Sequence, residues 1–230
     1  MNFTWLGHGS MRIESGEAKL LIDPWLTGNP VLPEEHHDAA ISGATHILLT
    51  HGHFDHIADV LPLARKLNVP VVGQYDLMGH WEATEGIQTI GFNKGGTVDA
   101  NGVAVTMVPA SHSSTVGTEE GPRCYGSECG FVLRSEGKCV YVSGDTDIMA
   151  DMAWMGEYYA PDIGILSAGG HFTMDMNATA WAAKKYFDFK TLIPVHYKTF
   201  PILEQSAEPL RVALPEVNVL SPEVMETIEL

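Results

Sequence analysis

The six residues 51–56, of sequence His-Gly-His-Phe-Asp-His, constrain this chain more than any other feature. They follow directly on an apolar run that is typical of a buried strand. In an extended segment the side chains at positions i and i+2 point to the same face, so His51 and His53 can converge on one ion. The chain must then turn, which lets Asp55 and His56 point toward a second ion. Imidazole and carboxylate are good ligands for zinc and similar divalent metals, so we expect a two-metal centre on a loop that leaves a strand.

Three further candidate ligands each lie just past an apolar run that predicts a strand. They are His112 after residues 103–108, Asp145 after residues 138–142, and His196 after residues 191–195. Taken singly, each has a plain structural alternative, because an aspartate can cap a following helix and a histidine can hydrogen-bond locally. In α/β folds, sites form where strand ends face a common edge. The shared position of these three residues after strands therefore favours a place beside the histidine cluster.

The composition is that of an ordinary globular protein, with 45% hydrophobic and 18% charged residues over a length of 230. This length suits one sizeable domain, and we expect residues 1–230 to form a single one. The 29 acidic residues outnumber the 13 basic ones and give a formal charge of −16. Such an excess repels phosphate backbones, which argues against nucleic-acid binding. A site with two divalent cations is locally positive, so a small-molecule substrate can still be anionic.

The sequence also predicts where the protein works. Residues 1–7 lack the basic and long apolar regions of a signal peptide, and no stretch approaches the length of a membrane span. The three cysteines, Cys124, Cys129 and Cys139, have no zinc-knuckle spacing. Their odd number fits reduced thiols, with a Cys124–Cys129 disulfide as the less favoured alternative. We therefore expect a cytoplasmic protein without a membrane span, and the oligomeric state is left open.

Short strands and helices follow one another in both halves of the chain. Strands are predicted at residues 2–6, 11–14, 20–23, 45–49, 69–73, 103–108, 130–134, 138–142, 163–166, 191–195 and 217–220. Helices are predicted at residues 57–67, 76–84, 148–159 and 178–187. This order predicts two sheets that pack together, with helices on the outside.

The cluster at residues 51–56, the lone His112, the Gly144-Asp145-Thr146 motif and the late His196 together resemble the metallo-β-lactamase superfamily. The resemblance covers essentially the whole chain. It implies an α+β fold (α/β in some schemes), a four-layer αβ/βα sandwich with a metal site along one edge of the sheets. It further implies one ion held by His51, His53 and His112, a second held by Asp55, His56 and His196, and Asp145 bridging both.

A finer resemblance is to small metal-dependent hydrolases similar to the L-ascorbate-6-phosphate lactonase branch. The segments that carry it are Trp5-Leu6-Gly7-His8, Ile22-Asp23-Pro24-Trp25, Gly28-Asn29-Pro30, His171-Phe172-Thr173-Met174 and Pro194-Val195-His196-Tyr197. The implied reaction is hydrolysis of a small ester, lactone or phosphoester by a hydroxide that bridges two divalent ions. Asp55 would be catalytic, orienting the hydroxide and passing its proton to the leaving group. Zinc is the favoured metal, and manganese, nickel or iron suit the same ligands.

Several residues outside the ligand set are candidates for the pocket. His8 lies in a glycine-flanked turn and His171 follows two glycines at a strand end, so each either approaches the metals or has only a structural role in its turn. Asp23 either hydrogen-bonds a ligand histidine or caps the Asp-Pro turn. For Lys198 and Arg123, a solvated surface charge is favoured over binding of a substrate phosphate.

Alternative functions come from two classes. Among enzymes, a phosphodiesterase or nuclease is disfavoured by the charge of −16. A thiolesterase like glyoxalase II is disfavoured because the sequence shows no extra C-terminal helical domain. An oxygen-reducing iron enzyme uses similar ligands. Outside enzymes, the chain can be a metal-binding scaffold or sensor without turnover. A hydrolysis screen discriminates between the two classes.

Overall fold

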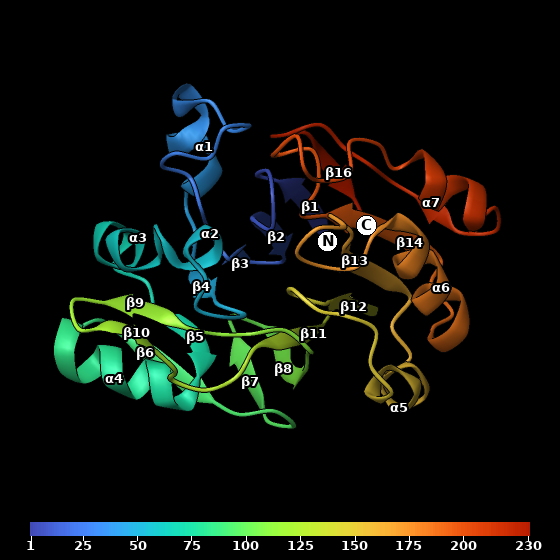
Figure 1. Ribbon diagram of the computed structural model, residues 1–230. Coiled ribbons are helices and arrows are strands. Elements are labelled where there is room, and N and C mark those ends of the chain that lie inside the picture. Colours follow the sequence, from blue (N-terminus) through green and yellow to red (C-terminus); the bar gives the residue numbers. More distant parts are fainter.

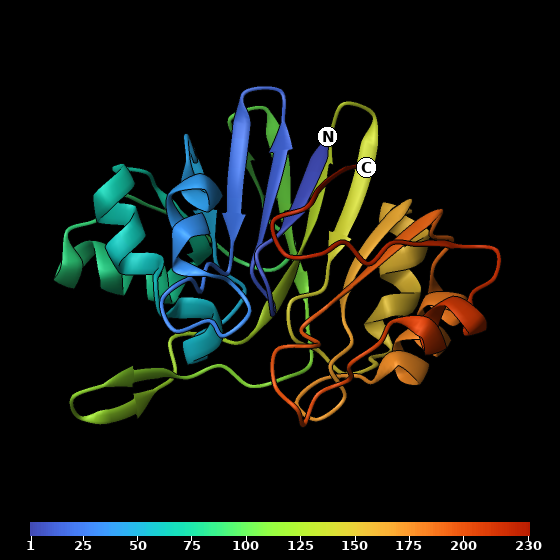
Figure 2. The ribbon, with the colours of Figure 1, turned by 90° about the horizontal axis from the view of Figure 1, so that it is seen from above.

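The computed structural model describes residues 1–230, which form two seven-stranded mixed sheets with helices on their outer faces (Figure 1). The two chain termini lie close together at one end of the sheets (Figure 2). None of the helices combines the length and the apolar character needed to cross a bilayer. The two sheets with helices on their outer faces confirm the predicted four-layer αβ/βα order.

The first sheet comes mostly from the N-terminal half of the chain. Its strands are β1 (Asn2–Trp5), β2 (Met11–Ser15), β3 (Ala18–Ile22), β4 (His46–Leu48), β5 (Val71–Gln74) and β6 (Thr89–Phe92), with β16 (Thr227–Glu229) beside β1. The helical segments of this half are η1 (Glu34–His36), α1 (His37–Ile41), α2 (Phe54–Ile57), α3 (Val60–Leu67) and α4 (Tyr75–Glu85).

The second sheet comes from the C-terminal half. Its strands are β7 (Thr97–Ala100), β8 (Val103–Pro109), β11 (Cys129–Ser135), β12 (Lys138–Val142), β13 (Ile163–Ser167), β14 (Thr191–Val195) and β15 (Asn218–Val219). Its helices are α5 (Asp151–Tyr159), α6 (Met176–Tyr186) and α7 (Glu208–Ala213). A separate hairpin of β9 (Val116–Thr118) and β10 (Gly121–Arg123) projects away from the body (Figure 2).

Both faces of the sheets are buried, which explains the nearly continuous apolar runs of the inner strands. A central cluster of 40 buried residues draws on both sheets, and a second cluster of 18 lies between the first sheet and its helices. Alternation along β3 shows the division, because Leu20 and Ile22 belong to the central cluster and Leu21 to the outer one.

The parallel part of each sheet positions the functional residues. Strands β3 to β6 run parallel to one another, and so do β12 to β15. The carboxyl ends of parallel neighbours meet at one edge, where the chain leaves the sheet and its side chains can converge.

The sequence predicted most of the elements and missed several. The helix predicted at residues 57–67 begins earlier, at Phe54, and is interrupted between α2 and α3. Asp55 and His56 therefore lie in a short helical turn. The strands β6, β7, β9, β10 and β16 and the helices α1 and α7 were not predicted, because they are short and show little apolar alternation. The three cysteines are free thiols, as predicted.

Candidate metal centre

All seven predicted ligands lie beyond the ends of strands, at the same edge of the two sheets. His51 and His53 follow β4, and Asp55 and His56 lie in α2. His112 follows β8, Asp145 follows β12 and His196 follows β14. Their ring nitrogens and carboxylate oxygens fall into two groups that meet at Asp145.

The outer group consists of His51, His53 and His112, whose ligand atoms lie within 4.8 Å of one another. His51 Nε2 is 3.1 Å from His53 Nδ1, as expected for side chains two positions apart in an extended segment. His53 and His112 are half-buried. Ser113 Oγ lies 3.1 Å from His53 Nε2, so the loop after β8 also contacts this group.

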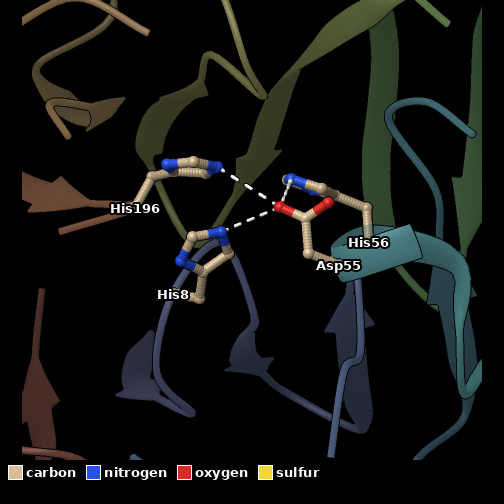
Figure 3. Close-up of side chains that lie close together, drawn as sticks. All are labelled: His8, Asp55, His56 and His196. Atoms are coloured by element: carbon tan, nitrogen blue, oxygen red, sulfur yellow. Dashed lines mark hydrogen bonds and ion pairs between the residues drawn. The ribbon is translucent and has the colours of Figure 1, made fainter. Parts of the chain in front are cut away.

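The buried group consists of His8, Asp55, His56 and His196, whose side chains point toward one another (Figure 3). The carboxylate oxygen Oδ2 of Asp55 lies at its centre. It is 2.8 Å from His8 Nε2, 3.4 Å from His56 Nε2 and 3.5 Å from His196 Nε2. The sequence left His8 open between a position near the metals and a structural role in its turn, and the structure places it in contact with Asp55.

Asp145 connects the two groups. Its Oδ2 atom lies 3.0 Å from His196 Nε2 and 3.5 Å from His56 Nε2 in the buried group. The same oxygen lies 3.7 Å from His112 Nε2 and 4.0 Å from His51 Nε2 in the outer group. One carboxylate therefore faces four imidazoles, which is the arrangement needed for a bridging ligand.

The buried atoms of the cluster fit a bound cation. His56 Nε2 and His196 Nε2 are buried and lack a hydrogen-bond partner, although each lies within 3.5 Å of both carboxylates. A buried polar atom without a partner is costly, and native structures avoid it unless an ion or water completes the site. The donor set of imidazole and carboxylate is one that zinc and related divalent ions prefer.

A hydrogen-bond network behind the cluster orients two of the histidines. Asp23 Oδ2 accepts from His56 Nδ1 at 2.8 Å and from Thr50 Oγ1 at 2.5 Å. Because the Thr50 hydroxyl donates to Asp23, it accepts from His51 Nδ1 at 2.9 Å. Both rings therefore carry the proton on Nδ1 and present Nε2 to the site, as such outer partners of metal-binding histidines commonly ensure.

The opposite side of the cluster holds Asp55. The ionised carboxylate can only accept, so His8 Nε2 donates to it. His8 Nδ1 is then an acceptor, and the Thr199 hydroxyl lies 2.9 Å away. Burial lowers the pKa of His8 to about 4, so the ring is neutral at pH 7. Thr50 and Thr199 were both missed by the sequence analysis; the position of Thr50 directly before the cluster was the available signal.

The charges of the cluster are strongly coupled. Burial by itself raises the pKa of Asp145, but the neighbouring His196 and His56 hold that pKa well below its ordinary value. Burial works to lower the pKa of His196, but the adjacent Asp145 raises it to about 9. Without a metal, protons on these histidines neutralise the carboxylates, and a divalent cation can take over that role.

The backbone around the cluster has unusual conformations. His8, Asp23 and His196 all adopt positive φ angles, of 55°, 49° and 63°. This region is unfavourable for side chains other than glycine, and such strain concentrates at functional sites. Gly9 is needed for a different reason, since a Cβ there would lie 2.6 Å from His56 Cε1.

Three of the candidate residues lie away from the cluster. His171 is exposed and lines a neighbouring hollow with Gly169, Gly170 and Asp175. Arg123, on β10, pairs with Glu120 at 2.7 Å. The Lys198 ammonium lies 3.4 Å from Glu223 and, in the fold, faces a separate hollow beside Trp5.

The comparisons with known proteins cover the chain from end to end. A family model described as a beta-lactamase superfamily domain matches residues 18–197. A UPF0173 metal-dependent hydrolase of Ruegeria pomeroyi is 69% identical over 229 residues, and one of Paracoccus denitrificans is 63% identical over 230; each match covers 100% of both chains. The solved structure of Igni18, a metallo hydrolase of Ignicoccus hospitalis, has a TM-score of 0.85 at 29% identity, over 99% of this chain and 97% of that one.

Proposed function

Since the chain belongs to the UPF0173 metal-dependent hydrolase family of the metallo-β-lactamase superfamily, we propose that it is a dinuclear hydrolase acting on a small ester, lactone or phosphoester. The observation that carries the proposal is the convergence of four imidazoles on Asp145 Oδ2, with a second carboxylate, Asp55, among them. Two ions that share a carboxylate are a recurring device of metal-dependent hydrolysis.

The proposed ligand set follows the two groups. His51, His53 and His112 would hold one ion; Asp55, His56 and His196 would hold the other, with Asp145 shared between them. When bound, the ions polarise the electrophile and lower the pKa of a water molecule at the site. Zinc is favoured by the imidazole-rich set, and manganese, nickel or iron are alternatives.

Asp55 is the proposed catalytic residue because its carboxylate lines the cavity beside the cluster. Its carboxylate can take the proton of the attacking water as the oxygen bonds to the carbonyl or phosphoryl centre. The carboxyl group can then give that proton to the leaving-group oxygen as its bond breaks. The hydrogen bond from His8 Nε2 holds the carboxylate in the orientation that this transfer requires.

The proposal is tested by elemental analysis of the purified protein together with a screen of ester, lactone and phosphodiester hydrolysis. Two divalent ions per chain and a metal-dependent activity are expected. Asp55→Asn should lower kcat by about 100- to 10,000-fold, the range of general acid–base catalysis. Asp76→Asn, an exposed acid in the first turn of α4, is the matched control. Unchanged turnover in Asp55→Asn, or two bound ions without any hydrolysis, would contradict the proposal, and the latter result favours a sensor.

We also propose that residues 1–230 act as one domain and that the protein is cytoplasmic. The central cluster of buried residues, which draws on both sheets, supports the first proposal. The three free cysteines, which suit a reducing compartment, support the second.

A further inference from the structure

A cavity of about 1010 Å³ opens beside the cluster. His53, Asp55, His112, Asp145 and His196 line it on the side of the proposed metals. Its volume is at the upper end of what small-molecule sites provide. The remaining side chains around it decide which part of a substrate can lie next to the reacting bond.

Those remaining walls are largely apolar. Three large hydrophobic side chains line the cavity although they are well exposed: Phe54 at 66%, Phe172 at 54% and Ile202 at 58%. They come from three separate segments, namely α2, the loop after β13 and the loop before α7. Exposed apolar side chains that gather around one opening are typical of a ligand-binding surface, since scattered ones need no such explanation.

Two further apolar residues extend the wall. Phe200 and Ile57 line the same cavity. On the hairpin side, Val116 completes the wall, and it approaches closely because Gly52 has no side chain: a Cβ at Gly52 would lie 2.8 Å from Val116 Cγ2. Apolar side chains therefore line the cavity both at α2 and at the hairpin.

Away from the cluster, the walls of the cavity offer no cationic side chain to an anionic group. No lysine or arginine lines the cavity, and the basic residues Lys198 and Arg123 pair with glutamates elsewhere. A phosphate or carboxylate on the distal part of a substrate would lose hydration against apolar walls without gaining a partner. Within a chain of formal charge −16, this favours an uncharged distal part.

From the apolar walls beside the cluster, we propose that the substrate is a neutral carboxylic ester or lactone with an apolar acyl portion, which lies against Phe54, Phe172 and Ile202. This inference rests on the proposed function and narrows it, since it excludes sugar phosphates and other substrates with an anionic tail. In the reaction, water adds to the acyl carbon, the acyl–oxygen bond breaks, and a carboxylic acid and an alcohol are released.

The test measures binding separately from turnover. The zinc-loaded protein is titrated calorimetrically with alkyl hydroxamates from acetohydroxamate to octanohydroxamate, whose head group chelates metal ions. The dissociation constant should fall about two- to fourfold for each added methylene, the upper value being that of full burial. Hexanohydroxamate should bind at least about tenfold more tightly than adipic monohydroxamate, which has the same chain length and a terminal carboxylate.

Variants test whether Phe172 and Ile202 cause the dependence of binding on chain length. Phe172→Ala and Ile202→Ala should flatten the dependence on chain length. Val212→Ala removes an exposed aliphatic side chain on α7, away from the cavity, and should retain the slope of the unmodified protein. p-Nitrophenyl esters from acetate to octanoate are assayed in the same preparations.

The outcomes separate the two proposals. A steep hydroxamate series that Phe172→Ala and Ile202→Ala flatten supports the apolar acyl site. If no ester, lactone or phosphodiester is hydrolysed in the same preparations, the hydrolase proposal is the one that fails. A flat series, a preference for the carboxylate tail, or a slope unchanged in both variants overturns the inference, even when esters are hydrolysed.

Discussion

The two halves of the candidate metal centre are built differently. In the buried group, the side chains of His8, His56 and His196 are each 1% exposed and Asp55 is 14% exposed. His56 and His8 are held from behind by Asp23 and Thr199. In the outer group, the Thr50 hydroxyl supports His51, whereas the partner of His53 is Ser113 in the loop that carries the β9–β10 hairpin. His53 and His112 are both half-buried.

This difference concerns how each half is kept in place. In the buried group, hydrogen bonds to Asp23 and Thr199 fix the rings of His56 and His8, so the positions of these two rings are set before a metal arrives. The outer group depends partly on a projecting loop, and loops are more mobile than the elements they connect. We therefore expect the ion of the buried group to be held more tightly and the ion of the outer group to exchange faster.

Removing the connection between the halves should have the largest effect. Asp145→Asn takes away the carboxylate that faces histidines of both groups. Hydrolysis should fall by about 1,000-fold or more, and bound metal to one ion or fewer per chain. Kinetics and elemental analysis check this, with the exposed Asp147→Asn as control. Two retained ions would show that the halves bind independently of Asp145.

The next largest effect distinguishes the halves by stability. His56→Ala leaves the Asp23 carboxylate without its ring donor inside the fold and opens a cavity against Gly9. We expect a loss of about 3 kcal/mol in the free energy of unfolding. His53→Ala, which removes a half-buried ring, should cost less than about 1 kcal/mol. Urea unfolding of the metal-free variants measures both, and equal losses would remove the distinction between the two groups.

A smaller effect should come from the support behind the buried group. Asp23→Asn keeps the size of the side chain and removes the charge that orients His56 Nδ1. Metal affinity should fall by about 10- to 100-fold, the usual cost of losing such a partner. Competition with a chromophoric chelator measures it. Asp59→Asn is the control, because this buried carboxylate holds the loop at Leu26 and Thr27 instead, and equal weakening in both variants would argue against a specific role.

The smallest effect should be confined to the outer group. Gly52→Ala places a Cβ 2.8 Å from Val116 Cγ2 and 3.0 Å from the Thr115 backbone, so the loop has to shift. We expect a loss of about 1 kcal/mol in stability and a few-fold faster release of one ion. Gly117→Ala, with open space around it, is the control. Stopped-flow chelation resolves the two ions, and faster release of both would mean that the loop supports the entire centre.

The sequence predicted the two halves of the candidate metal centre to different extents. The run at residues 51–56 and the positions of His112, Asp145 and His196 after apolar runs predicted a cluster at the strand ends, and the structure brings them together. The role of His8 was left open between the site and a turn. Its contact with Asp55 joins residues 47 positions apart, a pairing that local patterns do not encode.

The sequence by itself determined which imidazoles and carboxylates are available as ligands and the alternation of strands and helices, because these follow from residue type, spacing and apolar periodicity. The four-layer order was implied by the family resemblance. The tertiary structure decided which groups stand behind the ligands and which way the remaining polar candidates face. Asp23 and Thr50 reach the histidines, whereas His171, Lys198 and Arg123 lie away from the cluster. The tertiary structure also brought Phe54, Phe172 and Ile202 to one cavity. Such contacts depend on how distant strand ends and loops meet in space, and no periodicity within one segment carries that information.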